Sequence, residues 1–139
     1  MITKVEHIGI AVTDLDQAEK LYEKLLGVKP YKRETVENEH VITSFFKTGE
    51  TKIELLAALD DQSVIKKFIE KRGEGFHHIA FATDDIEKEM KRLKSEGFEL
   101  LHDQPKRGAD NKLVAFIHPK SAGGMLVELC QEINNGHKK

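Results

Sequence analysis

The chain of 139 residues is poor in cysteine and proline and has no long apolar run. Its single cysteine, Cys130, excludes a disulfide within the chain and is typical of a protein kept in a reducing compartment. No segment approaches the roughly 20 apolar residues of a membrane-spanning helix. The start, MITKVEH, also lacks the layout of a signal peptide. These absences predict a cytoplasmic protein without a membrane partner.

An excess of positive charge is also missing, since 22 Lys and Arg residues stand against 24 Asp and Glu residues, for a formal net charge of −2. A nucleic acid is therefore not an expected partner, because phosphate backbones are bound by basic surfaces. Hydrophobic residues make up 39% of the sequence and charged residues 33%. This composition and length predict one globular domain over residues 1–139.

What the chain does contain is a repeat of itself. When the segment VEHIGIAV near the start is set above FHHIAFAT in the middle, His7 aligns with His78. Near the end of each half, Glu54 of KIELL aligns with Glu128 of LVELC. A helical pattern follows the first segment of each half. The sequence therefore predicts two copies of one structural module.

Each module is predicted to fold as a strand, a helix and three further strands, βαβββ, in the α+β class. Asp14 and Asp85 are expected to cap the two helices. The first helix is expected to bury a face made of Leu15, Ala18, Leu21, Tyr22 and Leu25. The predicted segments are a first module at about 4–58 with later strands near 28–36, 39–48 and 51–58, a linking helix at about 61–72, a second module at about 75–131 with later strands near 98–103, 112–118 and 124–131, and a polar tail at 132–139. Neither half should bury a large core alone, so the two are expected to pack side by side.

The two aligned histidines are expected to share a face with small residues, because side chains alternate across a strand. In the first strand, Ile8, Ile10 and Val12 should pack under the helix, which leaves the opposite face to His7, Gly9 and Ala11. In the repeat, His78 lies beside Ala80 and Ala82 in the same way. Small neighbours do not fill a core, so we expect a hollow that suits a bound group.

The two aligned glutamates, Glu54 and Glu128, stand in the middle of apolar strands. A buried carboxylate requires a partner, because burying an unpaired charge costs several kcal/mol. A lone strand histidine is more often a hydrogen-bonded core residue than a ligand. Two histidines and two glutamates at equivalent positions instead predict a divalent metal site made of His7, Glu54, His78 and Glu128.

Three further residues have two interpretations each. His77 is either a residue that supports the metal ligands or a structural one, and His118 is either a site residue or a turn residue. Cys130 shares a strand face with Glu128, and burial as a small apolar side chain is the favoured interpretation.

The motifs HIGIAVTDL, GETKIELL, GEGFHHIAF, FIHPKSAGG and LVEL resemble the methylmalonyl-CoA epimerase family of the vicinal oxygen chelate superfamily, to which glyoxalase I also belongs. The resemblance spans about residues 5–131. It implies a glyoxalase fold in which a curved sheet encloses a metal cleft. It also implies an acyl-CoA substrate and a homodimer.

The resemblance further implies that His7, His78 and Glu128 bind a divalent cation, often cobalt, zinc, manganese or nickel. Glu54 falls on the position of the family's fourth ligand. Some epimerases use a further glutamate as a base, but Thr43 or a near neighbour occupies that place here. We therefore expect Glu54 and Glu128 to act as the two bases that remove and return the C2 proton of (R)- or (S)-methylmalonyl-CoA through a metal-stabilised enolate.

Two other functions are compatible with the same pattern. One is a lactoylglutathione lyase of the glyoxalase I type, against which the HPKSAGG and GEGFHHI segments argue. The other is a non-catalytic binding or resistance protein of the same fold, which would not need to keep four ligand positions. Lys106, Arg107 and Lys120 are candidate contacts for the CoA phosphates, although solvent-exposed surface positions are the simpler interpretation.

Overall fold

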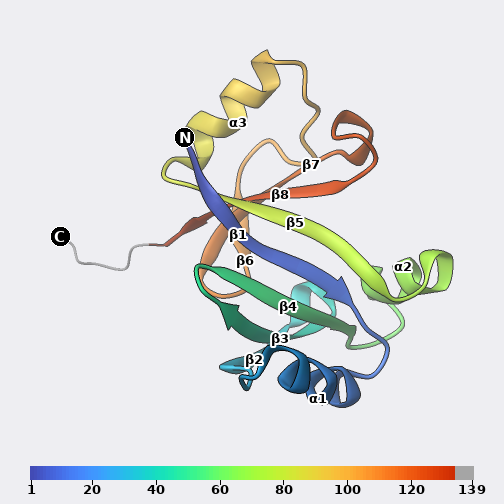
Figure 1. Cartoon of the computed structure of the whole chain (residues 1–139). Coiled ribbons are helices and arrows are strands. Elements are labelled where there is room, and N and C mark those ends of the chain that lie inside the picture. Colours follow the sequence, from blue (N-terminus) through green and yellow to red (C-terminus); the bar gives the residue numbers. More distant parts are fainter. Residues whose placement is uncertain (134–139) are drawn as a thin grey trace. The chain divides into compact units, whose positions relative to one another are not determined.

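The computed structural model describes residues 1–133. Of the predicted tail at 132–139, residues 134–139 therefore lie outside the described part, whereas Glu132 belongs to the last strand. None of the helices within the described residues is long and apolar enough to cross a membrane. The elements, in chain order, are β1 (Ile2–Ala11), α1 (Leu15–Leu26), β2 (Lys32–Val36), η1 (Glu37–Glu39), β3 (Val41–Thr48), β4 (Thr51–Ala58), α2 (Val64–Arg72), β5 (Gly75–Thr83), α3 (Ile86–Ser95), β6 (Lys106–Gly108), β7 (Lys112–Ile117), η2 (Pro119–Ser121) and β8 (Leu126–Glu132) (Figure 1).

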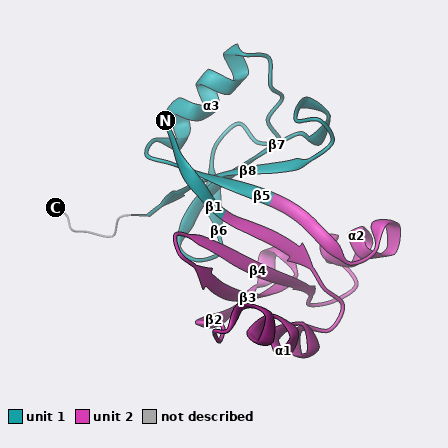
Figure 2. Cartoon of the chain, viewed as in Figure 1, with its two compact units in different colours: residues 1–6, 79–139 teal, residues 7–78 magenta. Residues whose placement is uncertain are grey.

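The chain divides into two compact units, and the division falls within β1 and β5 (Figure 2). Unit 2 is made of residues 7–78, and unit 1 of residues 1–6 together with residues from 79 onward. The strand order is β2-β3-β4-β1 in unit 2 and β5-β8-β7-β6 in unit 1. Each repeat thus places its first strand beside its fourth, which confirms the predicted pair of βαβββ modules.

The β3–β4 and β7–β8 hairpins have equivalent residues paired with each other, as expected for a structural repeat. In unit 2, β3 and β4 are antiparallel, and Phe45 lies opposite Glu54. In unit 1, β7 and β8 are antiparallel, and Phe116 lies opposite Glu128. Each glutamate therefore occupies the same place in its hairpin, as the sequence alignment predicted.

In unit 2, helix α1 begins at the cap that the sequence predicts. The Asp14 side chain accepts a hydrogen bond from the backbone N–H of Gln17, and Gly27 ends the helix in the left-handed conformation with φ 75°. The helix covers the face of the sheet that carries Val12 and Phe46, and its inward residues are Leu15, Ala18, Tyr22 and Leu26. The prediction that Leu15, Ala18 and Tyr22 face the sheet is therefore confirmed.

The prediction that Leu21 and Leu25 belong to this buried face is wrong, because their exposed fractions are 61% and 69%. At 100° per residue, the buried stripe is centred between Leu15 and Tyr22. Leu21 and Leu25 lie to one side of that stripe and outside the core cluster under the helix.

In unit 1, helix α3 packs on the outer face of β7 and β8. Asp85 caps the helix by accepting from the backbone N–H of Lys88. The core below it consists of Ile86, Met90, Leu93, Ala115, Ile117 and Leu129. The second helix therefore repeats the role that α1 has in unit 2.

The prediction of a strand near 98–103 is wrong. Only Leu100 forms an isolated bridge there, to Ile117, and the strand that pairs with β7 on the side away from β8 is β6 at residues 106–108. Phe98 and Leu100 are apolar because they pack against the core under α3, not because they belong to a ladder. A loop can bury apolar side chains without the regular hydrogen bonds of a strand.

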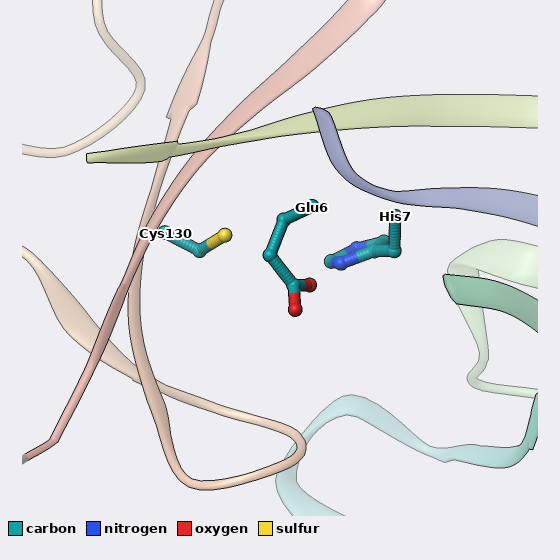
Figure 3. A group of neighbouring side chains, drawn as sticks. All are labelled: Glu6, His7 and Cys130. Atoms are coloured by element: carbon teal, nitrogen blue, oxygen red, sulfur yellow. The ribbon is translucent and has the colours of Figure 1, made fainter. Parts of the chain in front are cut away.

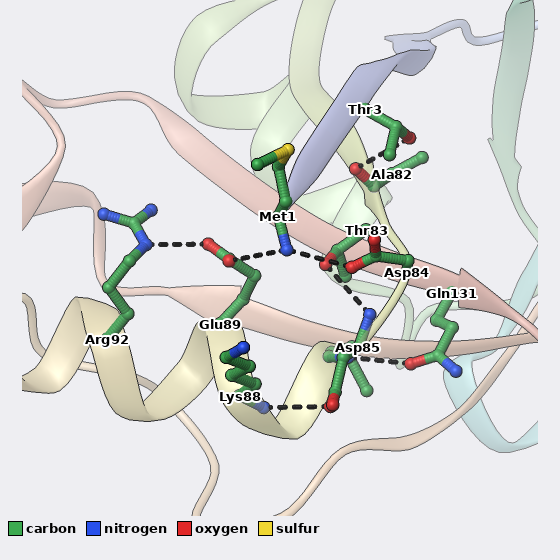
Figure 4. A network of polar contacts seen from close by, with 11 residues as sticks. Met1, Thr3, Ala82, Thr83, Asp84, Asp85, Lys88, Glu89, Arg92 and Gln131 are labelled. Atoms are coloured by element: carbon green, nitrogen blue, oxygen red, sulfur yellow. Dashed lines mark hydrogen bonds and ion pairs between the residues drawn. The ribbon is translucent and has the colours of Figure 1, made fainter.

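A polar network holds the start of α3 in unit 1 (Figure 4). The Met1 ammonium lies 2.9 Å from both Asp84 Oδ1 and Glu89 Oε2, and Arg92 Nε donates to Glu89 Oε1 over 2.9 Å. The Met1 ammonium, and then the Arg92 guanidinium, hold the pKa of Glu89 below its ordinary value. Asp84, and then Glu89, raise the pKa of the Met1 ammonium.

Replacing Glu89 by glutamine is expected to lower the free energy of unfolding by about 1 kcal/mol near neutral pH, since both of its partners are solvent-exposed and screened. Because the pKa of Glu89 is lowered on folding, its contribution is present above the ordinary carboxyl pKa and is lost as the pH falls through the lowered value. Because the pKa of the Met1 ammonium is raised, its contribution is lost as the pH rises through the raised value. Denaturant unfolding should show the largest difference from wild type between about pH 5 and 8.

The matched control is Glu87→Gln, an exposed glutamate of the same helix, which should change the unfolding free energy little at any pH. An equal loss in both variants, or a loss from Glu89→Gln that persists unchanged into acid, would contradict a role for the ion pairs.

Candidate metal centre

Three of the four predicted ligands converge within unit 2. His7 comes from β1, Glu54 from β4 and His78 from β5, and their exposed fractions are only 4%, 5% and 6%. Each offers one ligand atom, and these atoms all lie within 4.8 Å of one another. The three side chains therefore form one buried cluster of two imidazoles and a carboxylate.

The register of β1 and β4 explains how His7 meets Glu54. The two strands are parallel, with Lys52 opposite His7 and Glu54 opposite Gly9. His7 and Gly9 are two residues apart, so their side chains point to the same face and Glu54 lies diagonally across from His7. The Glu54 Oε2 atom is 3.2 Å from His7 Nδ1, close enough to accept a hydrogen bond from it.

The two imidazoles of His7 and His78 face one another through their Nε2 atoms, 3.0 Å apart. Their rings are nearly perpendicular, with an interplanar angle of 89°. The other ring nitrogen of His78, Nδ1, is 2.9 Å from Nδ1 of His77. Both Nδ1 atoms of the pair thus have a polar neighbour, and the two Nε2 atoms face one another.

Gly9 is what allows the ring of His78 to lie there. A Cβ atom built on Gly9 would overlap the imidazole carbon and nitrogen atoms of His78. The hollow that the sequence predicted beside the histidines is therefore filled, over Gly9, by a histidine ring. The small residue makes room for a ligand side chain rather than for a bound molecule.

The donor set fits a divalent cation. Two neutral imidazoles and one carboxylate are ligands that borderline transition metals accept. The Nε2 atoms of His7 and His78 are 3.0 Å apart, near enough for both to contact a single ion. A bound cation would also offset the charge of the buried Glu54 carboxylate.

Glu128 lies in unit 1, so its assignment as a fourth ligand stays a prediction. It is buried on β8, with an exposed fraction of 5%. It shares a face of unit 1 with Phe116 and Cys130, and Cys130 is fully buried there against Ala80 and Val114. Cys130 therefore fills the core of unit 1, in accord with the favoured interpretation from the sequence.

Thr43, which with its near neighbours is predicted to take the place of a glutamate base found in some epimerases, lies on β3. It is buried, with an exposed fraction of 2%, and it lies opposite Leu56 on the same face as Phe45. A threonine hydroxyl does not ionise near neutral pH, so Thr43 offers a hydrogen bond but no base.

His118 has the turn role that was one of its two predicted interpretations. Its Nδ1 accepts a hydrogen bond from the backbone N–H of Lys120 over 3.2 Å and so caps the short helix η2. The Lys120 ammonium lies 3.6 Å from Glu99, and the Lys106 ammonium lies over the ring of Phe116 at 5.9 Å. Lys106, Arg107 and Lys120 are exposed.

A buried ion pair in unit 1 was missed by the sequence analysis. The Lys112 ammonium is 3.7 Å from Glu6 Oε2, and the exposed fractions of the two residues are 5% and 3%. The Glu6 carboxylate also approaches the sulfur of Cys130, with ligand atoms within 4.8 Å (Figure 3). A cationic partner explains the burial of Glu6, and no signal in the sequence joins it to Lys112, because the two are more than 100 positions apart.

Comparison with known proteins gives a consistent result. A family model described as Glyoxalase/Bleomycin resistance protein/Dioxygenase superfamily matches residues 6–116. Uncharacterized protein YqjC of Bacillus subtilis is 37% identical over 138 residues, which cover 99% of this chain and 99% of that protein. Ethylmalonyl-CoA/methylmalonyl-CoA epimerase of Cereibacter sphaeroides is 40% identical over 133 residues, which cover 94% of this chain and 99% of that one.

A solved structure agrees with these relatives. It is a variant of Streptomyces coelicolor methylmalonyl-CoA epimerase in complex with 2-nitronate-propionyl-CoA, and it matches with a TM-score of 0.91 at 32% identity. The match covers 96% of this chain and 100% of that chain.

Proposed function

The chain belongs to the methylmalonyl-CoA epimerase family of the glyoxalase/bleomycin resistance protein/dioxygenase superfamily, and we propose that it interconverts (R)- and (S)-methylmalonyl-CoA with the help of a divalent cation. The observation that carries the metal part of the proposal is the buried cluster of His7, Glu54 and His78, whose ligand atoms lie within 4.8 Å of one another. A protein that only sequestered a ligand would have no need to bury this donor set.

The proposed ligands are His7, Glu54, His78 and Glu128, and the ion is cobalt, zinc, manganese or nickel. A cation bound there would supply positive charge beside the thioester oxygen, where negative charge develops as the C2 proton leaves. The residues of the chain set the position of that charge. Glu54 holds the ring of His7 through Nδ1, and Gly9 leaves the space in which the ring of His78 lies.

Epimerisation needs a base on each side of C2, because the proton leaves one face and returns to the other. We assign these roles to Glu54 and Glu128. Their equivalence supports the assignment: each glutamate is buried, and each lies opposite a phenylalanine, Phe45 or Phe116, in its own hairpin. The hydroxyl of Thr43 cannot take the place of either carboxylate.

The direct test is racemisation of a single enantiomer of methylmalonyl-CoA. Protein loaded with Co²⁺ is expected to convert either enantiomer to an equal mixture, protein stripped by a chelator is expected to lose that activity, and renewed addition of Co²⁺ should restore it. Circular dichroism before and after stripping establishes that the fold is retained. Folded, metal-loaded protein without racemisation would overturn the proposal.

The same preparations should be offered the hemithioacetal of glutathione and methylglyoxal. Turnover of that substrate alone would assign the chain to glyoxalase chemistry. Uptake of metal with no turnover of either substrate would favour a binding function. The cytoplasmic location and the homodimer remain predictions, and fractionation and light scattering would check them.

A further inference from the structure

His77 contacts the proposed metal centre without being one of its ligands. Its Nδ1 atom is 2.9 Å from Nδ1 of His78, and the two rings are nearly perpendicular, at 89°. The ring of His77 is half-buried and makes an edge-on contact with Phe68 of α2, with centroids 4.8 Å apart. Phe68 in turn packs against the core around Ile65. The position of the His77 ring is therefore set by α2.

A histidine that binds a cation through Nε2 must carry its remaining proton on Nδ1, and that N–H requires an acceptor. For His7 the neighbour at Nδ1 is Glu54 Oε2, a carboxylate oxygen 3.2 Å away that can accept. For His78 the neighbour at Nδ1 is another imidazole, that of His77. The two ligand rings are thus supported by different chemical groups, a carboxylate for one and a neutral ring for the other.

We propose that His77 is a positioning residue, which accepts a hydrogen bond from His78 Nδ1–H and so directs the Nε2 lone pair of His78 at the cation. This inference rests on the proposed function, since it assumes that His7 and His78 hold a metal. His77 must then carry its own proton on Nε2. A carboxylate in its place would add a negative charge to the centre, whereas an imidazole fixes the ring without one.

The contact between the two ligand rings makes the proposal specific. With an ion bound, neither Nε2 carries a proton. In stripped protein, a hydrogen bond across the 3.0 Å between His7 Nε2 and His78 Nε2 requires one proton there. If His7 donates its Nδ1–H to Glu54, the proton between the two Nε2 atoms belongs to His78. The Nδ1 atom of His78 then carries no proton and accepts a hydrogen bond from His77. Loading the metal therefore reverses the hydrogen bond between His77 and His78 without changing the number of protons on the three rings.

Assignment of the histidine tautomers by NMR tests this reversal in the unaltered protein. Two-bond ¹H–¹⁵N spectra of ¹⁵N-histidine-labelled protein should show His78 protonated on Nδ1 and His77 on Nε2 after loading with Zn²⁺. Protein stripped of metal should show the opposite tautomer for both. A loaded protein in which His77 remains protonated on Nδ1 would overturn the proposal.

Two variants separate positioning from packing. His77→Phe keeps a ring beside Phe68 but removes the acceptor, and it should bind Zn²⁺ roughly 10- to 100-fold more weakly in competition with a chelator. His77→Asn loses the ring but can place an amide oxygen near the position of Nδ1, and it should bind Zn²⁺ within a few-fold of wild type. The reverse order, or equal affinities in all three proteins, would contradict the proposal.

The outcomes also distinguish this inference from the function on which it rests. If wild-type protein takes up no divalent ion, the proposed metal centre is wrong and the inference fails with it. If wild-type protein binds Zn²⁺ and His77→Phe binds it equally well, the metal centre stands and only the role of His77 is wrong.

Discussion

Glu128→Gln and Glu54→Gln are each expected to lower the turnover of methylmalonyl-CoA epimerisation by roughly 100- to 10,000-fold, the usual contribution of a general acid or base. Glutamine keeps the shape of the side chain but cannot exchange a proton. Because each glutamate serves one face of C2, net turnover should fall with both enantiomers, whereas exchange of the C2 proton with solvent should be lost chiefly from one. The measurement is the rate of solvent-deuterium incorporation from each pure enantiomer at saturating Co²⁺.

Each variant has a matched control in an exposed glutamate near the same strand: Glu132→Gln on β8 for Glu128, and Glu50→Gln beside β4 for Glu54. Both controls should retain the wild-type exchange rate with both enantiomers. If neither Glu54→Gln nor Glu128→Gln selectively slows exchange from one enantiomer, the two-base assignment is wrong. Loss of bound metal in Glu54→Gln, measured separately, would report on its role as a ligand.

Gly9→Ala is expected to have the second large effect, because the added Cβ would overlap the ring of His78. The imidazole must move, and a displacement of about 1 Å at a reacting centre can cost roughly 100-fold in rate. We expect at least that loss in turnover, together with weaker Co²⁺ binding. Isothermal titration with Co²⁺ and the racemisation assay measure the two effects.

Gly108→Ala provides the control for this substitution. A Cβ on Gly108 would press on Val114 in the hairpin of β6 and β7, which belongs to unit 1. Both variants crowd a strand and should lose about 1–3 kcal/mol of stability. Only Gly9→Ala should lose metal affinity. Equal metal affinity in the two variants would mean that Gly9 has no special part in placing His78.

The strand faces could be predicted because alternation in a strand is a local property. Once His7 and Gly9 were assigned to one strand, their side chains had to share a face, and the repeat then placed His78 in the equivalent position. The pairing of Glu54 with Phe45 and of Glu128 with Phe116 agrees with that alignment. Because the sequence repeats, the same assignment of residues to strand faces could be made twice, once in each module.

The errors came from apolar residues whose neighbours lie far away in the sequence. Leu21 and Leu25 fit a helical face by spacing but are exposed and lie outside the core of unit 2. Leu100 looked like part of a strand, but it packs on the core under α3 and makes only one bridge. Hydrophobic spacing indicates which residues can be buried, and only packing decides which of them are.

By itself the sequence determined the duplicated βαβββ plan, the helix caps and the residue types available for a metal centre, because each of these depends on local spacing or on internal repetition. Tertiary structure decided how those residues meet. The ring of His78 lies over Gly9, its Nδ1 reaches His77, and Lys112 offsets the buried charge of Glu6. Such contacts depend on side-chain directions in three dimensions and on the burial of charge. Neither can be predicted from the residues that are adjacent in the sequence.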